Sequence, residues 1–377
     1  MASKGSNRKI NRSGKRTRNS ADKSEHQTND SPVVLDDVEI QSRVCTLICS
    51  GKSIREVQKE LASGNPSVQL TRQQPYTILK NAAKRGRIRY VAPIESELSL
   101  SFRNRYDWLH STEVVHTAEV ADIAEHASEK LLDLIGGSRS GGQPKEEFHI
   151  GFAGGGLLQH TARLLADKLR RTTRRLPKTL YFHSMVARFD EDPASDPNSF
   201  VGYLNSNPPI PVAVRFIGLM APGIVDVSTA MKLRKMEGIR EAYNRVSELD
   251  VVVTSAGGHW KTGCSRLHEM YLEKGHEALL ARLDQEGCLG DLMWRPFGAK
   301  GPIDLKSGIR AMTLVELADL PKLITQRKWV LLVLGRCVNC GNPKTEILRA
   351  LLNQQHPFIT DLVVDSITAR SVMSIAT

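Results

Sequence analysis

The segment His149-Ile150-Gly151-Phe152-Ala153-Gly154-Gly155-Gly156 decides the fold. Its apolar run predicts a buried strand from His149 to Ala153, and the three glycines predict a tight turn after it. The following residues, about 157–173, carry a helical pattern of apolar positions. A strand, a glycine turn and a helix in this order are typical of α/β proteins with a parallel sheet.

The same alternation continues through residues 146–377. We expect five further strands at Thr179–Val186, Val212–Leu219, Val251–Thr254, Trp329–Leu334 and Asp361–Val364. Helical patterns separate or follow them at about 229–248, 262–286, 314–326, 344–354 and 366–375. The pattern predicts an α/β domain with a mainly parallel sheet and helices on both faces. A polar and mixed stretch, 93–145, is expected to connect this domain to the residues before it.

Composition excludes several classes of protein. A length of 377 residues favours two or three domains, and 40% hydrophobic residues is ordinary for a globular protein. No apolar run approaches the roughly 20 residues that cross a bilayer, and the basic N-terminus lacks the apolar core of a signal peptide. Six cysteines in a chain of this length indicate reduced thiols. We therefore expect a cytoplasmic protein with no membrane partner.

The positive charge lies almost entirely at the front of the chain. The net charge is +11, of which residues 1–30 contribute +5, residues 31–50 contribute −2, and residues 51–90 contribute +7. The remaining 287 residues carry only +1. This asymmetry is typical of a small nucleic-acid-binding domain attached to a neutral body. Residues 1–34 are polar and basic without apolar periodicity, which predicts a disordered arm that either follows DNA phosphates or only aids solubility.

Residues 35–92 carry the pattern of a helix-turn-helix domain. Four apolar residues share one face of a first helix that ends at Gly51: Ile40, Val44, Leu47 and Ile48. Ser53 and Glu56 form the sequence of a capping box that opens a second helix, Ile54 to Leu61. Thr71 is the expected N-cap of a third helix that runs to about Arg85.

The third helix has the side chains that read DNA. Its inward face is expected to hold Ile78, Leu79, Ala82 and Ala83. The outer face and N-terminal end then carry the candidate DNA-binding residues Arg72, Gln73, Gln74, Tyr76, Thr77, Lys80 and Lys84. Arg and Gln pair with guanine and adenine edges in the major groove. A short strand over Ile88–Val91 would make the domain winged; the alternative is a three-helix packing module with a solvated charged face.

Candidate ligand-binding residues follow the predicted strands. Ligands of parallel sheets bind at the carboxyl ends of the strands, where backbone amides of glycine loops and helix N-termini attract anions. The candidates at these positions are Gly154, Gly155, Gly156, Gly257, Gly258, Asp291 and Lys344. Each could instead be a plain turn, cap or solvated residue. Because neither GxGxxG nor GK[ST] is present, no nicotinamide or nucleotide cofactor is expected.

The cysteines do not form a recognisable metal motif in sequence. Cys337-Val338-Asn339-Cys340 has the spacing of a metal-binding or redox pair, but no second CxxC or HxxxH completes it. Cys264 and Cys288 could reach this pair only through the tertiary structure. Cys45 and Cys49, one helical turn apart, are interpreted as packing residues. No metal site is therefore predicted.

With these residues in place, the chain resembles the SorC family of bacterial transcriptional regulators over roughly residues 40–377. The ordered landmarks are Thr71–Ile88, Ile150–Gly156, Ala221-Pro222, Gly287–Asp291, Lys344, Leu362–Asp365 and Thr368-Ala369. The family joins an N-terminal helix-turn-helix to a sugar-binding domain similar to sugar-phosphate isomerases. Leu157 stands where the family usually has a threonine that helps to bind the effector phosphate, and Cys337–Pro343 are extra residues before Lys344.

The resemblance implies a non-enzymatic regulator of transcription. Its partners would be an operator in double-stranded DNA, a small sugar or sugar-phosphate effector, and further copies of itself in a dimer or tetramer. Two alternatives stay open. One is an isomerase- or deaminase-like enzyme that uses Asp291 or His259 as a base, and the other is an interaction protein that has lost its ligand.

Overall fold

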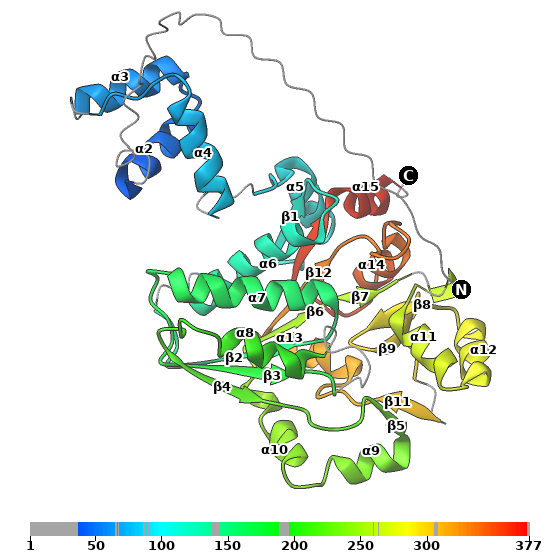
Figure 1. Ribbon diagram of the computed structural model, residues 1–377. Helices are drawn as coiled ribbons and strands as arrows, with labels where there is room; N and C mark the ends of the chain where they lie inside the picture. The colour runs from blue at the N-terminus through cyan, green and yellow to red at the C-terminus, as the bar shows by residue number, and fades with distance from the viewer. Residues whose placement is uncertain are drawn as a thin grey trace, which may run out of the picture. The chain divides into compact units, whose positions relative to one another are not determined.

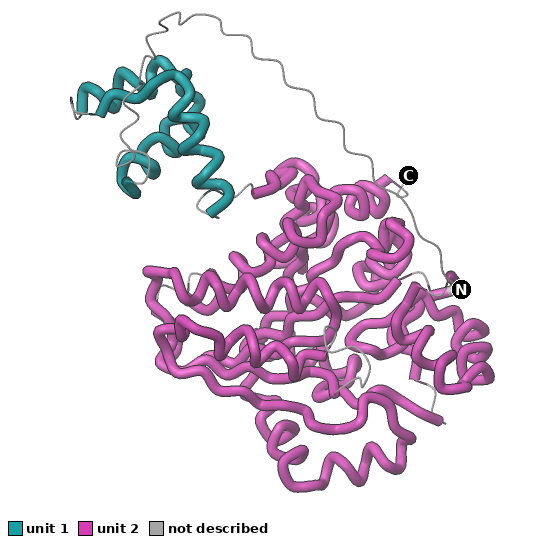
Figure 2. The backbone as a smooth tube through the Cα atoms, viewed as in Figure 1, with its two compact units in different colours: residues 1–90 teal, residues 91–377 magenta. Residues whose placement is uncertain are grey.

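The computed structural model describes residues 37–64, 66, 68–85, 88, 91–137, 143–187, 196–258, 260–262, 264–304 and 308–374 (Figure 1). The expected basic arm, 1–34, lies outside the described residues. The chain divides into two compact units, Met1–Tyr90 and Val91–Thr377 (Figure 2).

Unit 1 consists, in its described part, of the helices α2 (Val38–Cys49), α3 (Ile54–Gly64) and α4 (Gln74–Lys84). Each helix contributes to a small apolar core made of Val44, Val57, Leu61, Val68, Leu70 and Ile78. The Asp37 carboxylate accepts hydrogen bonds from the amides of Glu39 and Ile40 at the start of α2. The predicted capping box also forms, because the Ser53 amide donates to the Glu56 carboxylate over 2.7 Å and Ser53 Oγ accepts from the Glu56 amide over 3.4 Å.

Two details of unit 1 differ from the sequence prediction. The helix α4 begins after Gln73, not after Thr71. The Gln74 side chain accepts a hydrogen bond from the Thr71 amide over 2.7 Å, and this bond takes the place of the expected Thr71 cap. Ala83 is exposed and Leu79 is half-buried, since the buried stripe of α4 runs through Pro75, Ile78 and Ala82. Of the predicted wing, Ile88–Val91, the structure describes only Ile88 and Val91, and neither is in a strand.

Unit 2 is built on a seven-stranded sheet in the order β1-β13-β12-β6-β2-β3-β4. The strands are β1 (Ser111–Val115), β2 (Glu147–Phe152), β3 (Thr179–Ser184), β4 (Ala213–Ile217), β6 (Val251–Thr254), β12 (Trp329–Leu334) and β13 (Asp361–Asp365). Every pairing in this sheet is parallel. All residues of β6 and β13 are buried, so both faces of the sheet are covered there. The predicted parallel α/β fold is confirmed.

The order of the strands creates a reversal at the centre of the sheet. The chain passes outward from β2 to β3 and β4, then returns so that β6 lies on the other side of β2. Ile150 of β2 pairs with Val251 of β6 at this point. The loops after β2 and β6 leave the same edge of the sheet and diverge, which opens the crevice where ligands of such sheets bind.

Helices and smaller sheets surround the main sheet. The helices of unit 2 are α5 (Ser96–Arg105), α6 (Val120–Ile135), α7 (Gly156–Arg171), α8 (Val201–Leu204), α9 (Val227–Leu233), α10 (Ile239–Asn244), α11 (Arg266–Glu273), α12 (Glu277–Gln285), α13 (Leu320–Thr325), α14 (Thr345–Leu352) and α15 (Ser366–Ser374), with 3-10 turns at Pro197–Phe200, Val246–Glu248, Trp260–Thr262 and Leu317–Asp319. A four-stranded antiparallel sheet has the order β10 (Gly301–Pro302), β9 (Arg295–Gly298), β8 (Cys288–Leu292) and β7 (Ala256–Gly257), and β5 (Ile224–Asp226) pairs with β11 (Ile309–Ala311). The smaller sheets were not foreseen from the sequence.

The expected connecting segment, 93–145, is part of unit 2. It supplies α5, α6 and the edge strand β1, which pairs with β13 from Ser111↔Asp361 to Val115↔Asp365. The reason is the apolar face of α6, which buries Ile123, Leu131 and Ile135 completely. A helix with such a face is stable only when it is packed.

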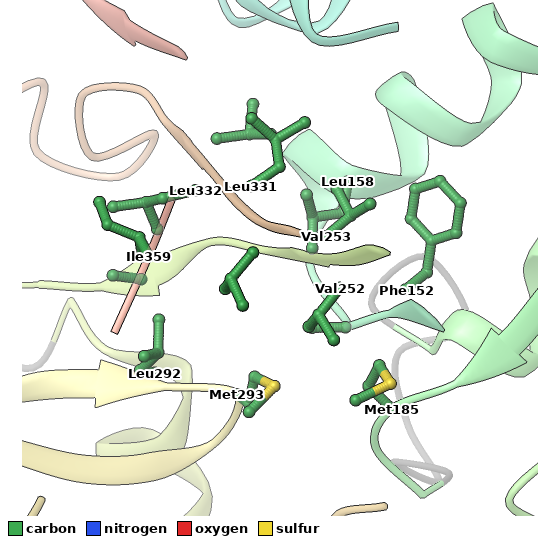
Figure 3. Packing of buried hydrophobic residues seen from close by; sticks show 14 of the residues in the cluster. Phe152, Leu158, Met185, Val252, Val253, Leu292, Met293, Leu331, Leu332 and Ile359 are labelled. Atoms are coloured by element: carbon green, nitrogen blue, oxygen red, sulfur yellow. The ribbon is translucent and has the colours of Figure 1, made fainter. Parts of the chain in front are cut away.

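The core of unit 2 joins the main sheet to the antiparallel sheet. Figure 3 places side chains of β2, β6, β12 and α7 in one cluster with Leu292 of β8 and Met293 of the turn that follows it. Val252, Val253, Leu331 and Leu332 are fully buried in it. Because the two sheets share this core, the loops at the carboxyl ends of β2, β6 and β12 are held in fixed positions.

Candidate functional site

A cavity of about 510 Å³ lies where β2, β6 and β12 end. It is lined by all seven residues that the sequence predicted for ligand binding: Gly154, Gly155, Gly156, Gly257, Gly258, Asp291 and Lys344. Three of these residues follow β2, two lie at β7 just after β6, one is on β8, and one precedes α14. The structure thus brings together groups that are up to 190 positions apart in the sequence.

The first wall is the glycine loop between β2 and α7. Gly155 is the N-cap of α7 and has φ +120° and ψ 150°, a conformation open essentially to glycine alone. A Cβ at Gly155 or Gly156 would meet no atom of the described residues within 4 Å. The backbone of this loop is therefore accessible from the cavity. No side chain caps the N-terminus of α7. Its first amides can therefore donate to an anion in the cavity.

The second wall brings Asp291 and Lys344 against the loop after β6. A Cβ at Gly257 would lie 2.0 Å from Asp291 Oδ2, and one at Gly258 would lie 3.1 Å from Lys344 Cγ. Close packing therefore restricts position 257 to glycine, whereas a side chain at position 258 would require the Lys344 stem to shift by a few tenths of an ångström. Lys344 Nζ donates to the Ala256 carbonyl over 2.8 Å, and Ser265 Oγ donates to Asp291 Oδ2 over 2.9 Å.

The two charged groups are shifted toward their neutral forms. Burial raises the pKa of Asp291, although the Ser265 hydrogen bond and the Lys344 charge act in the opposite direction. Desolvation lowers the pKa of Lys344, and the neighbouring Cys337, Asp291 and Asp365 oppose that shift. A buried carboxyl and a buried amine with opposed pKa shifts in one cavity are typical of a functional site.

The turn between β8 and β9 carries unusual backbone conformations. Met293 and Trp294 have φ +50° and +61°, and both line the cavity. Two positive φ values between paired strands are the geometry of a type I′ hairpin, which usually takes Asn-Gly. Bulky residues in this conformation are strained, and such strain is concentrated at functional sites.

Other residues of the cavity were missed by the sequence analysis. They are Val120, His160, Arg266, Glu269, Met293, Trp294 and Arg336, together with the hydrogen-bond partner Ser265. Gly335, which also lines the cavity, and Arg336 are the first two residues after β12, so the rule that placed Gly154 and Gly257 would also have found them. Leu157, the departure from the family pattern, lines the cavity as well. His259 lies outside the described residues.

The candidate DNA-binding residues lie on α4 and just before it. Arg72, Gln73, Tyr76, Thr77, Lys80 and Lys84 are exposed, and Gln74 is half-buried because its side chain bonds the Thr71 amide. Tyr76 exposes 59% of its surface, which is high for an aromatic side chain. One face of α4 is therefore basic and polar while Ile78 and Ala82 anchor the other in the core of unit 1.

Comparisons with known proteins agree with this architecture. No protein-family model matches the chain, and no curated protein matches it in sequence. The solved structure of the full-length sorbitol operon regulator SorC from Klebsiella pneumoniae covers 90% of this chain and 99% of its own length, with 14% identity and a TM-score of 0.62. The chain has a SorC-type fold.

Two further structures share the SorC-type fold at similar identity. A SorC family transcriptional regulator from Enterococcus faecalis covers 74% of this chain and 99% of its own, with 16% identity and a TM-score of 0.54. A DeoR family transcriptional regulator from Listeria monocytogenes covers 73% and 98%, with 17% identity and a TM-score of 0.52. The Klebsiella pneumoniae protein is described as an operon regulator and the other two as transcriptional regulators, and none is described as an enzyme. Among the described residues of this SorC-type chain, no helix has the length and apolar character to span a bilayer.

Proposed function

We propose that this protein is a cytoplasmic, DNA-binding transcriptional regulator whose cavity in unit 2 binds a sugar or sugar phosphate that changes operator affinity. The observation that carries the proposal is the convergence of the seven predicted residues on one cavity. Glycine amides and Lys344 suit a phosphate, and Asp291 suits sugar hydroxyls. The similarity to the sorbitol operon regulator supports the same assignment.

DNA binding is assigned to unit 1. The exposed face of α4 offers Arg72 and Gln73 at its N-terminal end, where recognition helices contact base edges. Residues 51–90 carry a net charge of +7, which favours contact with phosphates. The resemblance to the SorC family implies a homo-oligomer, so the effector would act by binding two arrangements of that oligomer unequally.

Gel-shift experiments test the DNA half of the proposal. The full-length protein is titrated against the DNA upstream of its own gene at low and high salt, in parallel with Arg72→Ala and Lys59→Ala. Because a base contact contributes about 1–3 kcal/mol, we expect Arg72→Ala to weaken specific binding by about 5-fold to 150-fold. Lys59 is an exposed lysine on α3, and Lys59→Ala is the matched control. It should weaken specific binding only a few-fold. The assignment fails if no salt-sensitive binding occurs or if both variants weaken binding equally.

Thermal-shift measurements test the effector half. A ligand that binds only the folded state stabilises it by about 2.7 kcal/mol at 100 times its Kd. We expect a sugar phosphate to raise the melting temperature of the wild-type protein, and the Lys344→Met variant to lose most of that shift. The thermal shift with the matching unphosphorylated sugar measures how much the phosphate contributes to binding. This comparison is critical because Leu157 stands where the family usually has a threonine that helps to bind the phosphate. If no sugar or sugar phosphate shifts the transition, the cavity has another occupant or none.

A second candidate function is catalysis on a sugar phosphate. It is favoured by the opposed pKa shifts of Asp291 and Lys344, since such pairs occur where acids and bases act. Turnover of a bound sugar phosphate, abolished by Asp291→Asn, would support this function. Binding without turnover supports the regulator.

A further inference from the structure

Three free cysteines meet at the wall of the cavity. Cys264 lies just before α11, whereas Cys337 and Cys340 lie in the loop between β12 and α14. Their three sulfur atoms lie within 4.8 Å of one another. We call Cys264, Cys337 and Cys340 the cysteine cluster. Within the described residues, no other group of histidine, cysteine and acidic side chains meets the same distance criterion with three members.

Backbone hydrogen bonds fix the loop that carries Cys337 and Cys340. The Cys337 amide donates to the Asn342 carbonyl over 2.9 Å, and the Gly341 amide donates to the Cys337 carbonyl over 2.8 Å. Gly341, directly after the second cysteine, has φ +69°, a conformation that favours glycine. The CxxC segment is thus a closed turn that presents two sulfur atoms without a bond between them.

The segment that carries Cys264 is fixed independently. Its neighbour Ser265 caps α11 through the His268 amide and donates to Asp291 over 2.9 Å. Cys337 is buried, Cys264 is half-buried and Cys340 is exposed, so the cluster lies at the edge of the protein interior. Lys344 interacts electrostatically with Cys337 and Cys340, and its charged form would offset negative charge on their sulfur atoms.

We propose that Cys264, Cys337 and Cys340 bind one Zn²⁺ ion through three thiolates. Tetrahedral zinc with bonds of about 2.3 Å places its sulfur ligands roughly 3.8 Å apart, so the cluster needs to contract by about 1 Å or less. Binding displaces three thiol protons to solvent and leaves a complex with a net charge of −1, and a water molecule completes the tetrahedron. Thiolates select soft and borderline metals over Mg²⁺ and Ca²⁺.

The ion would join two walls of the cavity. Cys264 and Cys337 both line it, and they belong to segments 73 positions apart in the sequence. A bond through the metal therefore restrains the loop after β12 against the segment before α11. Since this restraint exists only in the folded protein, zinc stabilises unit 2 whether or not the cavity binds a sugar.

Titration with Zn²⁺ and Co²⁺ tests the site in the reduced, metal-stripped full-length protein. We expect one equivalent of Zn²⁺ to bind and one equivalent of Co²⁺ to give thiolate-to-metal charge-transfer bands and the intense visible bands of tetrahedral cobalt. Cys264→Ser, Cys337→Ser and Cys340→Ser should each weaken binding by about 100-fold and remove the gain in melting temperature. Cys49→Ser, which changes an exposed cysteine of α2 in unit 1, should bind like the wild type.

Specific results would overturn the proposal. Binding of less than half an equivalent of metal excludes the site. A cobalt spectrum unchanged in Cys264→Ser shows that the third ligand is absent. A mass two hydrogen atoms below that of the reduced chain, seen in Cys264→Ser but lost in Cys337→Ser and in Cys340→Ser, identifies a Cys337–Cys340 disulfide in its place. The melting temperatures of the metal-free variants verify that each one folds, so that loss of metal is not loss of structure.

Discussion

At the scale of single residues, Gly257 and Gly258 determine how closely the loop after β6 approaches the charged groups of the cavity. The backbone of Gly257 runs against the Asp291 carboxylate, and the backbone of Gly258 runs against the Lys344 stem. A side chain at either position would take the space of the group that it packs on. Their role is therefore steric, whereas the glycines of the loop after β2 leave backbone amides open to the cavity.

Gly257→Ala tests this steric role. The added Cβ would lie 2.0 Å from Asp291 Oδ2, so β8 or the loop must move. We expect a loss of about 1–3 kcal/mol in the free energy of unfolding, together with loss of the ligand-induced thermal shift. Urea denaturation measures the first effect. Gly202→Ala on α8 is the control, because its Cβ meets no atom within 4 Å and alanine favours a helix.

His183 makes the stability of unit 2 depend on pH. Burial, with the neighbouring His149 and Arg245, lowers the pKa of His183 to about 3, and its Nε2 lies 2.9 Å from His149 Nδ1. Because the unfolded chain takes up a proton near pH 6.5 and the folded chain does not, stability falls as the pH decreases below about 6.5. Burial also lowers the pKa of His149. The nearby carboxylates of Glu248 and Asp250 act to raise the pKa of His149 but do not overcome the effect of burial.

We therefore expect the free energy of unfolding to fall by on the order of 1 kcal/mol per pH unit between pH 6 and pH 5. Urea denaturation over this range should give a shallower slope for His183→Leu, whereas His356→Gln, at an exposed position, should keep the wild-type slope. An equal slope in His183→Leu would assign the pH dependence to other groups.

At the scale of elements, the buried parallel strands were predictable and the short antiparallel strands were not. The strands β6, β12 and β13 are almost entirely buried on both faces, so their sequences contain apolar runs of at least three residues. The strand β1 was missed because Glu113 interrupts its apolar pattern, and the structure accommodates this carboxylate through Lys130 Nζ at 2.9 Å. The strands β7 and β10 have two residues each and give no periodic signal.

The difference between local and long-range signals also explains which residues of the cavity could be predicted from the sequence. The carboxyl-end rule needs only a strand and the loop after it, so it found Gly154–Gly156, Gly257 and Gly258 from local sequence. The contact of Ser265 with Asp291 joins the start of α11 to β8, and the meeting of Cys264 with Cys337 joins the same segment to the loop after β12. No local pattern encodes distances of that kind.

Ser53→Ala tests the element-scale stability of unit 1. It removes the side-chain cap of α3, and losing such a cap costs about 1 kcal/mol. We expect the melting transition of unit 1, followed by helical circular dichroism of residues 37–92, to shift to lower temperature. Ser63→Ala at the other end of α3 is the control and should change the free energy by less than about 0.5 kcal/mol. Equal effects of the two substitutions would show that the capping box does not stabilise α3.

At the scale of the whole molecule, the two units have different charges. Residues 1–90 carry +10 and residues 91–377 carry +1, so the attraction to a polyanion is concentrated in unit 1, which includes the basic arm. The cavity lies entirely within unit 2. A small neutral or singly phosphorylated ligand would therefore alter DNA affinity through conformation and not through the overall charge.

Deletion of residues 1–34 distinguishes the two interpretations of the basic arm. The arm carries eight Lys and Arg residues against three acidic ones. Because each neutralised phosphate contributes about 0.9 to the slope of log K against log salt, we expect the truncated protein to show a slope shallower by at least about 2. Fluorescence anisotropy with labelled operator DNA measures the slope. An unchanged slope would make the arm a solubilising tail.

The reversal of strand order between β2 and β6 has a consequence for how this scaffold can diversify. Since the residues that line the cavity lie on separate loops after the strands, each loop can be lengthened or exchanged while Val252, Val253 and Leu331 keep their neighbours. By the resemblance to the SorC family, Cys337–Pro343 would be one such change, and these residues lie in the loop after β12, outside the strand. Grafting this segment onto a relative that lacks it would transfer its two cysteines without changing the hydrophobic core. The loops at the carboxyl ends of the strands are therefore a suitable place to engineer binding of new ligands.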